Sequence, residues 1–171
     1  IETVDETRKL KYVQEFRNNM TVKTQGKISK SKSKSYTQVS WIVDFSRFGI
    51  IEYGDDMMKL MIRRIYDICG TTPSDVKFYF NRKLIKLNSF ERYIQLYLND
   101  EKIVYFDVNG RWKVGVATGL TDRFEHYSFV NGISTFKGGK HVDYVAKQIV
   151  TGIIEYVEKK YKTDINPSYV K

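Results

Sequence analysis

The most specific stretch of the chain covers residues 128–145 and reads Ser128-Phe129-Val130-Asn131-Gly132-Ile133-Ser134-Thr135-Phe136-Lys137-Gly138-Gly139-Lys140-His141-Val142-Asp143-Tyr144-Val145. Its first part belongs to a segment, 124–133, that is predicted to form one strand. Its second part opens a long helix, predicted over 141–160, because apolar residues recur there at three- and four-residue steps. These residues are Val142, Val145, Ala146, Ile149, Val150, Ile153, Ile154 and Val157.

Upstream of this stretch, a second helix is predicted over 57–69, where apolar residues again have helical spacing. Asp55 or Asp56 can cap its N-terminus, and Gly70 is expected as the left-handed residue that follows its last turn. A third, short helix is predicted to start at Asn88 and to run through Tyr97, since Asn88 and Glu91 have the spacing of a capping box.

Strands are predicted in the remaining parts of the chain. Asn109-Gly110 lies between two alternating apolar runs, 103–108 and 112–117, which is the strongest local signal for a hairpin. A further strand pair is predicted over 76–87, with its turn at Asn81-Arg82. Helices and hairpins in this order predict an α+β fold.

The first 45 residues predict two strands joined by an exposed basic loop. Segments 10–20 and 36–45 are expected to pair, with every second residue of 39–45 on one buried face. The lysine- and serine-rich tract 27–35 lies between them, and its composition cannot bury a core face. It is interpreted as a solvated hairpin tip, with a DNA contact as the alternative.

Composition excludes several classes of protein. Lys and Arg number 29 against 20 Asp and Glu, giving a net charge of +9 and suggesting a polyanionic partner, while a merely basic surface remains the alternative. No run approaches the ~18–20 apolar residues of a membrane span. The single cysteine, Cys69, excludes a disulfide framework and a zinc site built from cysteines. No phosphate-binding P-loop, nucleophile elbow or Rossmann glycine pattern is present.

The glycine pair before the long helix offers one weak anion-binding signal. Free backbone N–H groups at a helix N-terminus attract anions, and Lys137 and Lys140 add positive charge on either side of Gly138-Gly139. A helix entry that requires glycine for its backbone geometry explains the pair equally well. His141, close to the helix start, is interpreted as structural rather than catalytic.

Four motifs in the same order resemble those of eukaryotic-type type IIA DNA topoisomerases. The stretch 128–145 resembles the family signature Ser-Phe-Val-Asn-x-Ile-x-Thr-x-x-Gly-Gly-x-His-Val, which leads into a long helix. Segment 60–68 resembles a Leu-Met-x-Arg-Arg-x-Tyr-Asp-Ile helix, 111–114 resembles Arg-Trp-x-Val, and Tyr36-Thr37 opens a strand as in the family. The resemblance extends over nearly the whole chain and is weakest over the first 35 residues.

The resemblance implies a two-part fold. Residues 1–88 would form the C-terminal part of a GHKL-type ATPase domain, an α/β sandwich. Residues 89–171 would form the first part of a transducer domain with a ribosomal-protein-S5-like fold. The family cofactors are ATP and Mg²⁺, and Thr37 matches the strand threonine whose hydroxyl helps to fix the adenine. The other ATP-binding elements would lie before Ile1 or after Lys171, so this segment alone is expected to lack ATPase and strand-passage activity.

The resemblance also implies partners. Lys159, Lys160 and Lys162 match a lysine-rich transducer loop that reaches double-stranded DNA, although Glu158 replaces a first lysine and Tyr161 interrupts the run. Lysines that only complement the helix dipole are the alternative. The family acts as a homodimer, in the nucleus or, for a large DNA virus, in the nucleus or a cytoplasmic replication site of the host. Two other functions stay open, a stand-alone S5-like nucleic-acid-binding module without enzymatic activity and a purely structural or dimerising domain.

Overall fold

A computed structural model describes residues 1–98, 102–118 and 123–170, which divide into two compact units. The first unit covers Ile1–Tyr53 and the second covers Gly54–Lys171. Strands and one 3₁₀ turn form the first unit and helices with hairpins form the second, so the predicted α+β class is confirmed. In the described part of the chain no helix combines the length and the apolar composition that crossing a membrane requires.

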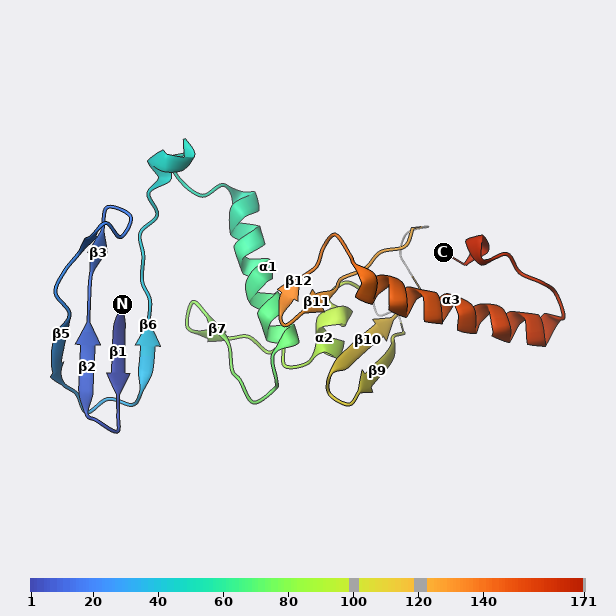
Figure 1. Ribbon diagram of the computed structural model, residues 1–171, viewed down its shortest axis with the longest axis horizontal. Helices are drawn as coiled ribbons and strands as arrows, with labels where there is room; N and C mark the ends of the chain where they lie inside the picture. Colours follow the sequence, from blue (N-terminus) through green and yellow to red (C-terminus); the bar gives the residue numbers. More distant parts are fainter. Residues whose placement is uncertain (99–101, 119–122, 171) are drawn as a thin grey trace. The chain divides into compact units, whose positions relative to one another are not determined.

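The first unit is a four-stranded antiparallel sheet in the order β5-β2-β1-β6 (Figure 1). Its strands are β1 (Glu2–Asp5), β2 (Leu10–Val13), β5 (Lys27–Lys30) and β6 (Tyr36–Gln38). After β2, the strands β3 (Phe16–Arg17) and β4 (Val22–Lys23) form a separate two-stranded antiparallel pair. A 3₁₀ turn at Phe45–Phe48 follows β6. Val4 of the central strand β1 is the buried residue of this sheet.

Three predictions for the first unit are wrong. The strand expected over 10–20 ends at Val13, and the chain reverses at 18–20 through three residues with positive φ, two of them asparagines, which adopt that conformation most readily among non-glycine residues. The strand expected over 36–45 ends at Gln38 and pairs with β1, not with 10–20. The expected buried face after it is not formed, because Trp41 is 75% exposed.

The lysine- and serine-rich tract is only partly a loop. Its first four residues form the edge strand β5, which pairs with β2 from Lys27 to Lys30. All four side chains are exposed. Strand pairing uses backbone groups, so an edge strand can form without an apolar face, and its lysines discourage further pairing at the open edge. The prediction of a loop therefore holds only from Ser31 onward.

In its described residues the second unit contains three α-helices and three hairpins. The helices are α1 (Asp55–Thr71), α2 (Phe90–Gln95) and α3 (Lys140–Tyr161), followed by a 3₁₀ turn at Pro167–Tyr169. The hairpins are β7 (Tyr79–Phe80) with β8 (Lys83–Leu84), β9 (Val104–Val108) with β10 (Trp112–Val116), and β11 (Phe129–Val130) with β12 (Ile133–Ser134). The predicted helices and the turns at Asn81-Arg82 and Asn109-Gly110 are confirmed, each with positive φ at both turn residues.

The core of the second unit lies where α1 meets α2. Cys69, Leu87 and Tyr93 are buried, and partly buried apolar side chains surround them: Ile65, Phe78, Ile85, Phe90, Tyr97 and Phe129. Gly70 lies inside α1 rather than after it, so its predicted left-handed role is wrong. A Cβ on Gly70 would lie 2.6 Å from the Cβ of Tyr93, so glycine is needed there for close helix contact.

Two helix starts and one strand also differ from prediction. Gly54, not Asp55 or Asp56, is the N-cap of α1, and the two aspartates lie in its first turn, where they complement the helix dipole. Ser89, one residue after the predicted Asn88, caps α2 and accepts a hydrogen bond from the Arg92 N–H. The single strand predicted over 124–133 is instead the β11–β12 hairpin, whose turn is a second Asn-Gly pair.

Candidate functional site

Thr37 lies on the edge strand β6, where its side chain is exposed. Its hydroxyl lies 3.0 Å from the hydroxyl of Thr3 on the adjacent strand β1, and the two residues are register partners. One hydroxyl can donate one hydrogen bond and accept two, so this pair has spare acceptor capacity for a polar group. Thr37 therefore presents an exposed hydroxyl that can form a further hydrogen bond.

A carboxylate beside Thr37 is already engaged within the sheet. Glu2 accepts a hydrogen bond from the Tyr36 hydroxyl and forms an ion pair of 2.7 Å with Lys11. The hydrogen bonds from Lys11 and Tyr36 hold the pKa of the Glu2 carboxyl below its usual value. Glu2 is thus fixed as an anion at neutral pH, in a cluster that orders three neighbouring strands.

No metal centre forms within the residues that the structure describes. No group of three or more His, Cys, Asp or Glu side chains lies close enough together there to hold an ion. The described residues therefore offer no ready-made cluster of metal ligands.

A buried polar cluster joins α1 to α2. Asp67 is 2% exposed and accepts hydrogen bonds from the Tyr93 hydroxyl at 2.6 Å and from Arg64 at 3.2 Å. The Tyr97 hydroxyl lies 2.7 Å from that of Tyr93, and Arg63 lies 4.0 Å from Asp67. A buried carboxylate needs such partners, because leaving it unpaired is costly.

Sequence reasoning did not find this cluster, although one signal for it was present. Arg63 and Arg64 precede Asp67 by four and three residues, the spacings at which oppositely charged side chains meet on a helix. The partner tyrosines could not be found in this way, because Tyr93 lies 26 residues further along the chain. Burial and the hydrogen bond to Asp67 raise the pKa of Tyr93 far above its ordinary value, so it stays a donor.

Both histidines of the chain belong to a second network, at the start of α3. Thr135 of the segment after β12 contacts the His141 Nε2 at 3.0 Å and the Ser128 hydroxyl at 2.6 Å. Ser128 in turn lies 3.3 Å from the His126 Nδ1. This chain of hydrogen bonds fastens the first turn of α3 to the β11–β12 hairpin, which supports the structural interpretation of His141.

The predicted DNA-contacting lysines fall into two groups at opposite ends of α3. Lys137 precedes the helix and Lys140 is its first residue, whereas Lys159, Lys160 and Lys162 lie at its end. At 1.5 Å per residue, the two groups are roughly 30 Å apart, as the single long helix in Figure 1 illustrates. They do not form one patch.

The terminal group is not uniform. The Lys160 ammonium lies over the Tyr156 and Tyr161 rings, at 5.4 and 5.2 Å from their centroids, and donates to the Tyr156 hydroxyl at 3.2 Å. Lys159 is exposed in the last helical turn, and Lys162 follows in the left-handed conformation that ends α3. The tyrosine that interrupts the lysine run thus binds its middle cation.

A family model described as DNA gyrase B matches residues 78–171, more than half of the chain. The chain belongs to the DNA gyrase B family. Two relatives of this gyrase B family member are a "Probable DNA topoisomerase 2" of Dictyostelium discoideum, 39% identical, and the "DNA topoisomerase 2" of Acanthamoeba polyphaga mimivirus, 43% identical. Both matches cover 100% of this chain, but only 12% and 14% of the respective relatives.

Two solved structures have the same fold as this gyrase B family chain. The ATPase region of Saccharomyces cerevisiae topoisomerase II matches with a TM-score of 0.85 and 38% identity, over 97% of this chain and 43% of that one. The ATPase and transducer domains of DNA topoisomerase II from Balamuthia mandrillaris match with a TM-score of 0.72 and 26% identity, over 94% and 42% of the two chains. The expected fold, the end of a GHKL domain followed by a transducer, is therefore confirmed.

Proposed function

We propose that this chain is part of the ATPase and transducer region of an ATP-dependent type II DNA topoisomerase. Such an enzyme passes one duplex through a double-strand break in another and relays ATP binding and hydrolysis to its DNA gate. The observation that carries the proposal is the match of 97% of this chain to the topoisomerase II ATPase region, at a TM-score of 0.85.

The proposed domain boundary lies near Asn88, with the GHKL part before it and the transducer part after it. The buried cluster crosses this boundary, because Asp67 lies on α1 and Tyr93 lies on α2. A movement of one part relative to the other must therefore either carry both helices together or break a buried hydrogen bond. This rigid link is what a relay between a nucleotide site and a distant DNA gate requires.

The proposed cofactors are ATP and Mg²⁺. Thr37 would contribute its hydroxyl to the adenine network, since it is exposed beside the Thr3 hydroxyl. Among the described residues no group of three or more possible metal ligands comes together, so we assign no Mg²⁺ ligand to them. ATP supplies the free energy for closing the gate, and this chain contributes orientation of the base.

The proposed nucleic-acid partner is double-stranded DNA, bound through the lysines at the end of α3. Lys159 and Lys162 are exposed and extend the basic end of the helix. Lys137 and Lys140 would form a separate contact, because they lie at the other end of the same helix. Each neutralised phosphate adds about one unit to the salt dependence of binding. We further propose a homodimer, working in the nucleus or at a viral replication site.

The test uses the protein that the complete reading frame encodes. We expect it to relax supercoiled plasmid only when ATP is present, and to hydrolyse ATP faster when duplex DNA is added. Replacing Lys159, Lys160 and Lys162 together by Gln should lower this stimulation and reduce the salt slope of DNA binding by about 2–3 units. Lys147→Gln, an exposed lysine in the middle of α3, is the matched control. A protein without ATP-dependent relaxation would contradict the proposal.

A further inference from the structure

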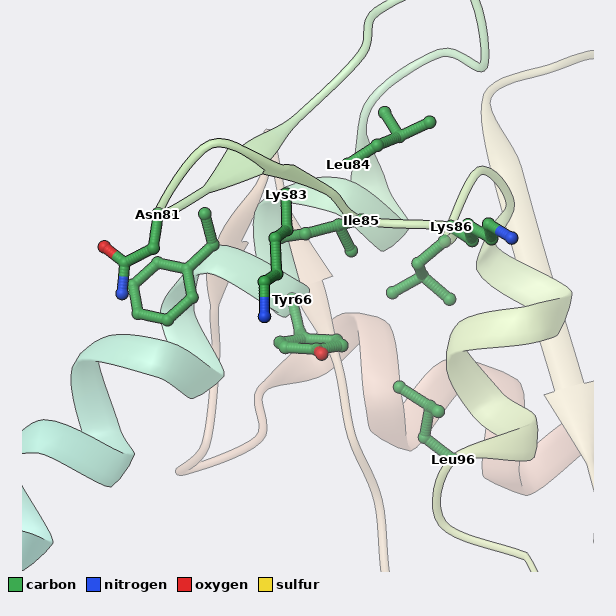
Figure 2. A pocket seen from close by; sticks show the side chains of 9 residues that line it. Tyr66, Asn81, Lys83, Leu84, Ile85, Lys86 and Leu96 are labelled. Atoms are coloured by element: carbon green, nitrogen blue, oxygen red, sulfur yellow. The ribbon is translucent and has the colours of Figure 1, made fainter.

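A pocket of about 580 Å³ lies in the second unit, between α1, the β7–β8 hairpin and α2. Its walls are mainly apolar, with Tyr66 from α1, Phe80 from the hairpin, and Leu87 and Leu96 from either side of α2. Figure 2 shows Tyr66 and Leu96 on the side of the pocket opposite the hairpin. The volume lies within the range of small-molecule sites, but the pocket is open to solvent, since Leu84 is 46% and Leu96 58% exposed.

The polar groups of the pocket are cationic or neutral. Lys83, Lys86 and the Asn81 amide line it, and among the residues that the structure describes no acidic side chain does. In Figure 2 the Lys83 side chain extends toward Tyr66, and the two lysines lie on either side of Ile85. Within the described residues, no carboxylate lies within 4.0 Å of either ammonium group.

The sequence segment that contributes most of the pocket lining is also positively charged. Segment 76–90 contains Lys77, Arg82, Lys83 and Lys86 but no Asp or Glu. Lys83 and Lys86 are exposed, so water solvates their ammonium groups in the free protein. A ligand that carries a negative charge and an apolar body together can pair with one of these lysines while it covers the apolar walls.

We propose that this pocket binds a small amphipathic organic anion. Its flat apolar body would contact Tyr66 and Leu96, and its carboxylate, sulfonate or phosphate group would pair with Lys83. Such a ligand touches α1, the hairpin and α2 at once, and Leu87 in its wall is also a core residue. Binding would therefore hold the two helices together and raise the melting temperature of the unit. The proposal is independent of the topoisomerase function.

The test compares two fluorescent probes of nearly the same shape. 8-Anilino-1-naphthalenesulfonate carries one negative charge, and N-phenyl-1-naphthylamine lacks it. Titrated at constant ionic strength into the protein that the complete reading frame encodes, the sulfonate should bind more tightly than the neutral probe. Lys83→Gln should weaken sulfonate binding about fivefold, the scale of a partly exposed ion pair, and leave binding of the neutral probe unchanged. That unchanged affinity also shows that the variant is folded.

Two further variants locate the binding site. Leu96→Ser should weaken the binding of both probes, because it removes an apolar side chain from the wall of the pocket. Lys77→Gln should leave the binding of both probes unchanged. Lys77 is a cation of the same segment, but it does not line the pocket. The proposal is overturned if Lys77→Gln weakens sulfonate binding as much as Lys83→Gln does. It is also overturned if Lys83→Gln leaves sulfonate binding unchanged.

Discussion

Two carboxylates in this protein have the same kinds of partner in different surroundings. In the first unit, Glu2 accepts from the Tyr36 hydroxyl and pairs with Lys11. In the second, Asp67 accepts from the Tyr93 hydroxyl and pairs with Arg64. The Glu2 side chain is 28% exposed and the Asp67 side chain is 2% exposed.

The difference in burial decides what each cluster contributes. Water can replace a lost partner of Glu2, so that cluster orders three strands without large energetic consequences. Water cannot reach Asp67 in the same way, so a lost partner leaves a buried group unsatisfied. A carboxylate bound by a tyrosine and a cation therefore forms a surface contact in the first unit, whereas in the second unit it links two helices through the core.

The largest effect is expected from Asp67→Ala. It leaves the Tyr93 hydroxyl without its acceptor and two arginines without their anion. Breaking a buried pair costs about 3–5 kcal/mol, and the arginines are half-exposed, so a loss near 3 kcal/mol is expected. Urea unfolding measures it. Asp67→Asn keeps the shape and an acceptor oxygen and should lose less than half as much. A loss below about 1 kcal/mol for the alanine variant would contradict the central role of this cluster.

The packing that buries Asp67 can be tested at Gly70. Gly70→Ala places a Cβ 2.6 Å from the Cβ of Tyr93, so one helix must shift away from the other. Overpacking of this kind costs about 1–3 kcal/mol. Gly152→Ala in α3 is the matched control, because apart from the neighbouring backbone of its own helix no described atom lies within 4 Å of its Cβ. It should stabilise the protein by about 0.5–1 kcal/mol through helix propensity. If thermal or urea unfolding showed that both variants change the stability in the same direction, α1 and α2 would not be in such close contact at Gly70.

Tyr93→Phe removes one hydroxyl from the buried cluster and tests it by pH. At neutral pH the loss should be about 1–2 kcal/mol, whereas Tyr79→Phe at an exposed position should change stability by less than about 0.5 kcal/mol. Burial and the bond to Asp67 raise the pKa of Tyr93 above its unfolded value of about 10. Its contribution is therefore present below pH ~10 and is lost as pH rises further. Wild-type melting temperature should fall more steeply above pH 10 than that of the variant. Parallel alkaline curves would refute this assignment.

Sequence patterns identified the elements whose signals are local. The helix α3 has a complete apolar stripe, and the β9–β10 hairpin has an Asn-Gly turn between strands of five residues each. The same Asn-Gly pair at 131–132 forms a hairpin that the sequence pattern does not predict, because the strands beside it have only two residues each. The two Asn-Gly turns have the same residues, so the length of the flanking strands explains why only the hairpin at 109–110 is predicted from the sequence.

Long-range relations could not be read from local patterns. A glycine at position 70, after the last apolar turn, predicts a helix end. Its actual role depends on Tyr93, which lies 23 positions further on. The β1–β6 pairing likewise joins residues 32 to 36 positions apart, such as Thr3 with Thr37. For the candidate site, the resemblance to known proteins indicated Thr37 and the lysines. The geometry then separated those lysines into two groups and revealed the cluster around Asp67.

The smallest effect is expected from Glu2→Gln, at the exposed member of the comparison. Hydrogen bonds from Lys11 and Tyr36 lower the pKa of Glu2 below its unfolded value of about 4.3. Its contribution to stability is thus present above that value and is lost as pH falls through the folded pKa. The variant should melt slightly below the wild type at pH 7, and the difference should vanish near pH 2, where both side chains are uncharged. Glu6→Gln removes a negative charge of the same unit without breaking an ion pair among the described residues, and so controls for net charge. A difference that persists unchanged at pH 2 would mean that Glu2 acts through packing, and the contrast with Asp67 would then not be one of charge burial.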